Sequence, residues 1–178
     1  RRRRQGEYAY VGVGPRLVIL DISDPAHPVF VGQTDPLPGI LWDVAVAGSY
    51  AYVTAHVSGL RIIDVSEPAA PYEIGAYQTG GQPQSVAVVG DYAFVTDLFT
   101  GLHIVDVSDP AAPFQAGHYS TPGSGAGVAV AGSYAYVGTG ESGLRVIDVS
   151  SPTAPFEAGF YDTPGHAGRV AVAGTYAH

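Results

Sequence analysis

The chain lacks four residue types entirely: cysteine, methionine, lysine and asparagine. Without cysteine it can form no disulfide, no thiolate metal site and no thiol nucleophile, so these chemistries are excluded. Basic residues are also scarce, since arginine alone supplies its 8 cations against 16 acidic residues, and the formal net charge is −8. Nucleic-acid binding requires a clustered basic surface, and this composition does not provide one.

Helical signals are missing as well. No window repeats apolar residues with the period of a helix, and no apolar run approaches the ~20 residues that cross a bilayer as a helix. The chain instead contains 24 glycines, 14 prolines and 46% hydrophobic residues. This composition is typical of a packed, turn-rich globular protein, and 178 residues suit one domain.

A repeat organises the whole chain. The motif Gly-x-Tyr-Ala recurs every 42 residues, at Gly6, Gly48, Gly90, Gly132 and Gly174. Within the third repeat, four short pieces rich in Val, Ile, Tyr or Phe are separated by turn residues, and they cover 85–90, 92–96, 102–108 and 114–120. Such pieces predict β-strands. We therefore expect an all-β protein in which each repeat forms a four-stranded antiparallel meander.

Both faces of the predicted sheets are apolar. Leu102 and Ile104 point to one face of the third piece, whereas Val105 and Val107 point to the other. A sheet that is apolar on both faces cannot leave one face in water. Identical sheets that cover one another, with a period of about 40 residues and four strands, are typical of β-propeller blades.

One strand of each repeat carries a family resemblance. It reads LVILD from Leu17, LRIID from Leu60, LHIVD from Leu102 and LRVID from Leu144. These strands resemble the LVIVD-repeat family of β-propellers, over residues 6–178. The resemblance implies a bacterial or archaeal secreted or surface protein, mostly of kinds without an assigned activity. The expected location is therefore extracellular or at the cell surface.

The repeat frame divides the chain. We expect residues 1–5, which hold half of all the cations, to be an artificial or fragment end, and residues 6–178 to form the propeller. The predicted copies are 6–47, 48–89, 90–131, 132–173 and a partial copy at 174–178.

The number of blades in the complete ring has two interpretations. Strand 169–174 can pair with residues 6–11 and close a four-bladed ring. Alternatively, the four blades are an arc of a larger ring of roughly six to eight blades, completed by further residues or by another chain. We favour the arc, because the chain stops inside a strand. An arc leaves two apolar faces that need a partner.

Four aspartates recur in register, and we assign them a structural role. Each stands two residues before a serine and a proline turn, where a carboxylate accepts backbone N–H groups. A residue present in every blade serves what all blades share. These repeat residues are Asp21, Asp64, Asp106 and Asp148.

The copies differ most in two loops, the loop that enters the first strand and the loop that joins the second and third strands. In a meander both lie at the same end of the blade, so together they form one rim. Variable loops on a rigid scaffold are where binding residues concentrate. Trp42, the only tryptophan, either forms an exposed platform or fills the space between two blades. The candidate binding residues on this rim are Trp42, His56, Asp97, Phe99, Glu141, His166 and Arg169.

Two functions remain open at this point. We favour a non-enzymatic binding or structural module of a surface or secreted protein, with a protein or glycan partner, further copies of itself, or the rest of a longer chain. The sequence has no G-x-S-x-G, H-E-x-x-H, P-loop or EF-hand motif, and we assign no catalytic residue, metal ligand or cofactor. The alternative is an enzyme or sugar-binding propeller with its site on the rim, which requires the candidate residues to converge.

Overall fold

The computed structural model describes residues 2–174 and 176–177. Four antiparallel sheets of four strands follow one another along the chain, and each is a meander in sequence order. The first sheet consists of β1 Arg2–Gln5, β2 Tyr8–Val13, β3 Arg16–Asp21 and β4 Val29–Gln33. The second consists of β5 Leu41–Ala47, β6 Tyr50–Ala55, β7 Leu60–Asp64 and β8 Tyr72–Tyr77. The third consists of β9 Pro83–Val89, β10 Tyr92–Asp97, β11 Gly101–Asp106 and β12 Phe114–Tyr119, and the fourth of β13 Gly127–Ala131, β14 Tyr134–Gly138, β15 Leu144–Asp148 and β16 Phe156–Tyr161.

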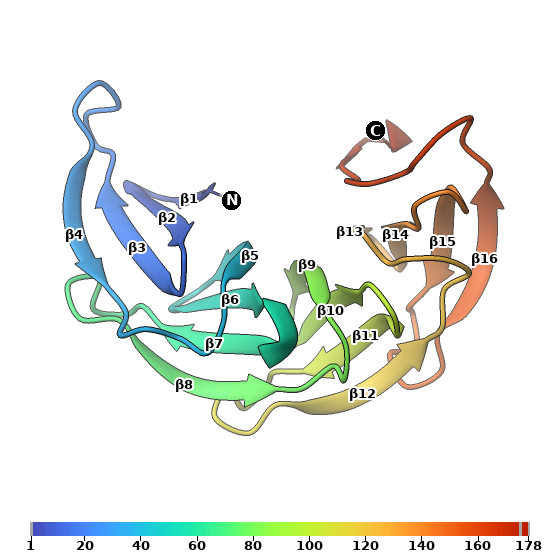
Figure 1. The fold of residues 1–178 in the computed structure, drawn as a ribbon, viewed down its shortest axis with the longest axis horizontal. Coiled ribbons are helices and arrows are strands. Elements are labelled where there is room, and N and C mark those ends of the chain that lie inside the picture. The colour runs from blue at the N-terminus through green and yellow to red at the C-terminus, as the bar shows by residue number, and fades with distance from the viewer. Residues whose placement is uncertain (1, 175, 178) are drawn as a thin grey trace.

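The sheets stand face to face around an open arc (Figure 1). Strands β1, β5, β9 and β13 lie on the inner side of the arc, and β4, β8, β12 and β16 form its outer side. Neighbouring inner strands contact each other from one sheet to the next, as β5 and β9 do. The chain is a β-propeller, as predicted, and its sheets are the blades.

Local sequence explains the strand ends. The Gly of each Gly-x-Tyr-Ala motif has a positive φ, for example +57° at Gly90, and closes the tight turn between the first and second strands. In every sheet a bulge shifts the register between the third and fourth strands, as between Ile104 and Val105. The only helix among the described residues is a 3-10 turn, η1 His56–Ser58. None of the described helices is therefore long or apolar enough to cross a membrane.

The core consists of three apolar layers, one between each pair of adjacent sheets. The layer between the third and fourth sheets contains Phe94, Leu102 and Ile104 from one side and Val137 and Ile147 from the other. Equivalent residues form the layers between the first and second sheets and between the second and third sheets. The second and third sheets are thus buried on both faces by their neighbours, as the two-sided apolar strands predict.

The first sheet begins with residues that precede the first Gly-x-Tyr-Ala motif. Arg2–Gln5 form β1 and pair with β2 in the first-strand position. That residues 1–5 are an artificial or fragment end stays a prediction. The first sheet therefore has four strands of its own. Arg1 lies outside the described residues.

The last repeat does not close the ring. Instead of pairing with residues 6–11, β17 Val172–Ala173 pairs with β18 Tyr176–Ala177 as a separate hairpin. The four sheets consequently form an arc whose two ends open toward the same side (Figure 1). The fourth sheet has no complete sheet on its far side, so Leu144 is only half-buried, although its counterpart Leu102 is fully buried.

Candidate functional site

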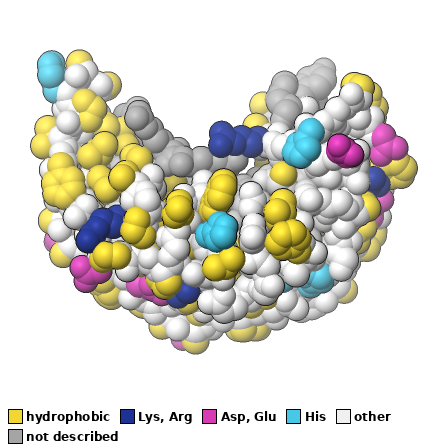
Figure 2. Space-filling model, in the orientation of Figure 1, with side chains coloured by type: hydrophobic (Ala, Val, Ile, Leu, Met, Phe, Trp, Pro, Cys, Tyr) yellow, Lys and Arg dark blue, Asp and Glu magenta, His cyan; other side chains and the backbone are white. Residues whose placement is uncertain are grey.

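In the third and fourth blades the two variable loops meet at one rim. In the third blade, the Thr79 hydroxyl of the entry loop donates to Asp97 Oδ2 at 2.6 Å, at the end of β10. In the fourth blade, a Cβ added at Gly123 of the entry loop would lie 2.7 Å from Ser142 Oγ of the loop between β14 and β15. Side chains from both loops therefore share one end of the molecule. The space-filling view shows the arc with its two arms (Figure 2).

Trp42 and His56 lie together on this rim. Their ring centroids are 6.2 Å apart with planes only 22° from parallel, so the two rings stack. Trp42 is 46% exposed, which makes it an exposed platform and not a filler between blades. The neighbouring Ile40 and Val57 are also exposed. We call Ile40, Trp42, His56 and Val57 the Trp–His patch.

His56 has an unusual backbone conformation. It is the one non-glycine residue with a positive φ among the described residues, at 26°. Such values are uncommon outside glycine and carry a cost in conformational energy. The η1 turn that begins at His56 thus holds the ring against Trp42 in a defined position.

Asp97 has a different role from the one the sequence suggested. Its side chain is buried, and it accepts hydrogen bonds from the Thr79 hydroxyl and from the N–H groups of Phe99 and Thr100. Burial raises the pKa of this carboxyl, but these donors together outweigh it and hold the pKa below its ordinary value. Asp97 therefore organises the two loops from inside, and it presents no carboxylate to solvent.

The other rim candidates lie on the third blade, on the fourth blade and in the residues that follow β16. Phe99 is 70% exposed, and Glu141, His166 and Arg169 are exposed as well. The His166 ring lies beside Gly140, the neighbour of Glu141 in sequence, where an added Cβ would be 3.3 Å from its Nε2 atom. No group of three His, Asp or Glu side chains among the described residues is placed to hold a metal ion. His166 and the loop that carries Glu141 therefore lie close together, as Trp42 and His56 do.

The four repeat aspartates lie at the corners between the third and fourth strands. Each accepts the backbone N–H of the serine two residues later, as Asp64 does from Ser66 at 2.9 Å. The Ser66 hydroxyl and N–H together lower the pKa of Asp64. These contacts close the turn. Each blade has one such carboxylate.

A polar cluster that sequence reasoning did not assign lies between the second and third blades. The buried His103 is within hydrogen-bond distance of Tyr77 Oη at 3.1 Å and Gln115 Oε1 at 3.3 Å through Nδ1, and of Thr100 Oγ1 at 2.7 Å through Nε2. Its ring meets His118 edge to face at 4.8 Å. Burial, and then the neighbouring His118, lower the pKa of His103. His103 is therefore neutral at pH 7.

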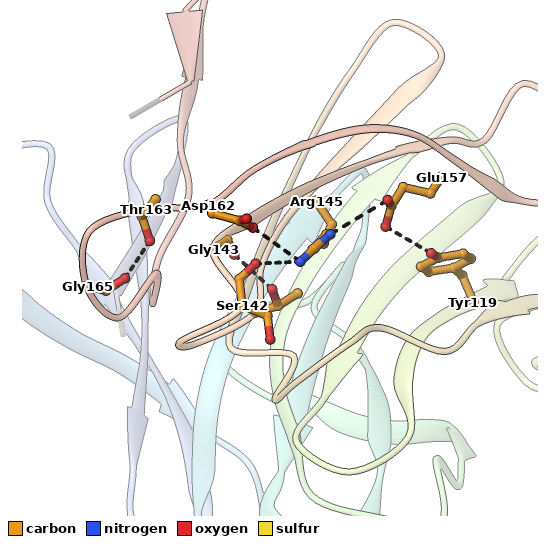
Figure 3. A network of polar contacts seen from close by, with 9 residues as sticks. Tyr119, Ser142, Gly143, Arg145, Glu157, Asp162, Thr163 and Gly165 are labelled. Carbon is orange, nitrogen blue, oxygen red and sulfur yellow. Dashed lines mark hydrogen bonds and ion pairs between the residues drawn. The ribbon is translucent and has the colours of Figure 1, made fainter.

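The fourth blade has an arginine in the place of His103. The Arg145 guanidinium donates to the Ser142 carbonyl at 2.9 Å and pairs with Glu157 at 3.7 Å and with Asp162 at 3.5 Å (Figure 3). It also lies over the Phe160 ring, 4.6 Å from the ring centroid. Tyr119 of the third blade donates its hydroxyl to Glu157 at 3.0 Å. Polar contacts thus join adjacent blades at their outer strands, and they belong to the scaffold.

The inner side of the arc also holds a cavity of about 400 Å³. It is lined by valines and alanines of β5, β9 and β13 and of residues 170–172. A cavity without polar side chains offers no group for orienting a ligand or moving a proton. It is the axial space of the propeller.

The fold and this rim define a β-propeller built from a single repeated blade. The LVIVD repeat matches residues 5–35, 38–79, 80–121 and 122–163, most of the chain. The chain belongs to the LVIVD-repeat family, as its repeated strand suggested. No curated protein matches its sequence.

Among solved structures, the chain resembles the computationally designed Ika8 protein, with a TM-score of 0.79 at 6% identity. The likeness covers 99% of this chain and 53% of the designed chain, so the chain spans about half the length of that protein. At this identity the likeness concerns the fold alone.

Proposed function

We propose that this chain is a non-enzymatic binding module of a secreted or cell-surface protein, and that it binds a protein partner through the Trp–His patch. The observation that carries the proposal is the stacked pair of exposed Trp42 and half-buried His56 on the variable rim, with Ile40 and Val57 exposed beside them in sequence. Rigid aromatic rings among exposed aliphatic side chains are typical of the centre of a protein interface.

A glycan is the second candidate partner. The Trp42 ring offers one open face of an exposed indole, and a sugar ring can stack on such a face with little loss of side-chain entropy. Sugar recognition, however, also requires hydrogen bonds to hydroxyl groups. The aliphatic neighbours therefore favour the protein partner.

The single tryptophan gives a direct test. We would pan a phage-displayed random-peptide library against the full chain, and titrate the selected peptides while following Trp42 fluorescence. The same titration with soluble cello- and chito-oligosaccharides tests the glycan alternative. Peptides that shift the fluorescence should bind at least about tenfold more weakly to the Trp42→Ala and His56→Ala variants, the former followed by calorimetry.

Glu141→Ala is the matched control, because Glu141 is exposed on the same rim but on another blade. Its affinity for the selected peptides should stay within about twofold of the wild-type value. The proposal is wrong if no peptide or oligosaccharide changes Trp42 fluorescence, or if Glu141→Ala weakens binding as much as Trp42→Ala does.

A further inference from the structure

The rim of the third blade carries an exposed aromatic residue of its own. Phe99, in the loop between β10 and β11, is 70% exposed, more than any other large hydrophobic side chain among the described residues. Its backbone N–H donates to the buried carboxylate of Asp97 at 2.9 Å, which fixes the loop that carries it. The second and third blades are both covered by neighbouring sheets, so the exposure of Phe99 belongs to the interior of the arc.

The loop between the second and third strands shows how far the apolar surface extends. The residue two places before the last glycine of this loop is Val57 in the second blade, Phe99 in the third and Glu141 in the fourth. Val57 is 61% exposed and Phe99 is 70% exposed. The same position is therefore apolar in two adjacent blades and acidic in the next one. The apolar surface covers the second and third blades only.

One loop connects the Trp–His patch to the loop of Phe99. It is the entry loop that precedes β9 of the third blade. At one end of it the Gln78 side-chain amide donates to the Ser58 carbonyl of η1 at 3.1 Å, and β9 itself contacts η1. At the other end the Leu98 N–H donates to the Gln82 carbonyl at 3.0 Å. The two apolar sites and this loop therefore form one continuous surface.

The segments that build this surface are almost free of charged residues. They are residues 38–42, 54–58, 78–84 and 97–100, and they contain no arginine and no glutamate. Their one carboxylate, Asp97, is buried, and their one histidine, His56, stacks on Trp42. The whole chain has a net charge of −8, so the lack of exposed acidic groups is a local property. Aromatic residues without charged neighbours are typical of the core of a protein interface.

The blade spacing sets the length of a ligand that reaches both apolar sites. Val57 and Phe99 occupy equivalent positions in adjacent blades, and packed sheets lie about 10 Å apart. An extended chain advances about 3.3 Å per residue, so it covers this distance in about three to four residues. Gly80, in the connecting loop, is exposed and has no side chain, so the backbone of a bound segment can lie close to the loop.

We propose that an uncharged, extended peptide segment of a partner protein lies across this surface, with one large apolar side chain on the Trp–His patch and a second on Phe99. The two side chains are three or four residues apart in the segment. A charge between them would be desolvated without an opposite charge on the surface, so the segment is uncharged there. The inference rests on the proposed function and names the ligand of the same rim.

The peptides selected by phage panning against the full chain test this inference. We expect panning to enrich uncharged peptides with two large apolar residues three or four positions apart. Phe99→Ala should weaken their binding at least about tenfold, as Trp42→Ala does, when both are measured by calorimetry. Glu141→Ala is the matched control, because Glu141 occupies the equivalent loop position of the fourth blade, and it should change the affinity by no more than about twofold.

Glycine substitutions in the peptide separate the two contacts. A peptide without one of its apolar residues should lose its sensitivity to Phe99→Ala and keep its sensitivity to Trp42→Ala, and a peptide without the other should show the reverse. Peptides weakened by Trp42→Ala but not by Phe99→Ala, or a selected pool that is mainly basic, overturn this inference and leave the proposed function intact. Peptides that Trp42→Ala does not weaken, or the absence of any bound peptide, overturn both.

Discussion

The third and fourth blades share one sequence pattern, one strand order and one register, yet they differ in what covers them. The outer face of the third blade lies against the fourth, and its large apolar residues are fully buried. The outer face of the fourth blade has the same pattern but lies open, with Tyr134 and Tyr161 exposed. The comparison teaches that the repeat encodes an interface, and that burial depends on a neighbour that the repeat itself does not supply.

The same two blades differ in the polar group between their third and fourth strands. The third blade has the neutral His103, which uses both ring nitrogens, whereas the fourth has Arg145 in an ion pair with Glu157. The buried Nε of Arg145 has no hydrogen-bond partner among the described residues. The same position on the third strand therefore accepts either a neutral histidine or a charged arginine, provided that the fourth strand supplies a matching Gln or Glu.

The largest expected difference concerns two equivalent leucines. Leu102→Ala should lower the free energy of unfolding by about 2–5 kcal/mol, because it removes a fully buried side chain from a packed layer. Leu144→Ala should cost at least about 1 kcal/mol less, because the fourth blade leaves Leu144 half-buried. Urea denaturation measures both. Equal costs would contradict the difference in burial between the two blades.

Two equivalent glycines provide the next comparison. Gly117→Ala should destabilise the chain by about 1–3 kcal/mol, since its Cβ would collide with the carbonyl oxygen of Pro152. Gly159→Ala should leave the stability nearly unchanged, because that position is open. Thermal unfolding of the two variants under identical conditions tests the difference. A stable Gly117→Ala variant would mean that the interface between the third and fourth blades is looser than it is here.

The rim loops of the two blades should respond differently to loss of an acidic residue. Asp97→Ala should cost about 1–3 kcal/mol, because the N–H groups of Phe99 and Thr100 and the Thr79 hydroxyl lose their acceptor. Glu141→Ala in the fourth blade should change the free energy of unfolding by no more than about ±0.5 kcal/mol. The same limit applies to His56→Ala in the second blade. Denaturant midpoints measure all three. A strongly destabilised Glu141→Ala variant would contradict the exposed position of Glu141.

The smallest effect is a pH dependence that only the third blade should show. The pKa of His103 in the folded chain lies below its value of about 6.5 in the unfolded chain. The unfolded chain therefore binds a proton at His103 more readily than the folded chain does. The stability that neutral His103 contributes is fully present above about pH 6.5. This contribution is lost as the pH falls from there through the lower pKa of His103 in the folded state. When the pH is lowered from 7.5 to 5.5, the denaturant midpoint of the wild-type chain should decrease by more than that of the His103→Gln variant. A parallel decline in both proteins would exclude His103 as the cause.

Much of this protein could be predicted before any coordinates. The 42-residue period, the alternation within each strand and the glycine turns act over a few residues, so they predict the strands, the meander and the blade. The corner aspartates are equally local, because each bonds to a serine only two residues away. The rim could be located from the loops that differ among copies.

The roles of particular rim residues could not be read in this way. Trp42 and His56 are separated by a whole strand pair, and only the fold brings their rings together. Asp97 looks like any acidic loop residue, but it is buried, and the Thr79 hydroxyl of the entry loop is one of its donors. His103 gave no signal in the sequence, because its partners Tyr77 and Gln115 come from different blades.

The sequence by itself determined the blade: its strands, its turns and the apolar pattern of both its faces. These depend on backbone sterics and on contacts between residues close along the chain. Only the tertiary structure decided which of these faces are covered, since burial requires a second surface brought from elsewhere. For that reason Gly117 and Gly159, which occupy the same place in the repeat, lie in a filled space and in an open one.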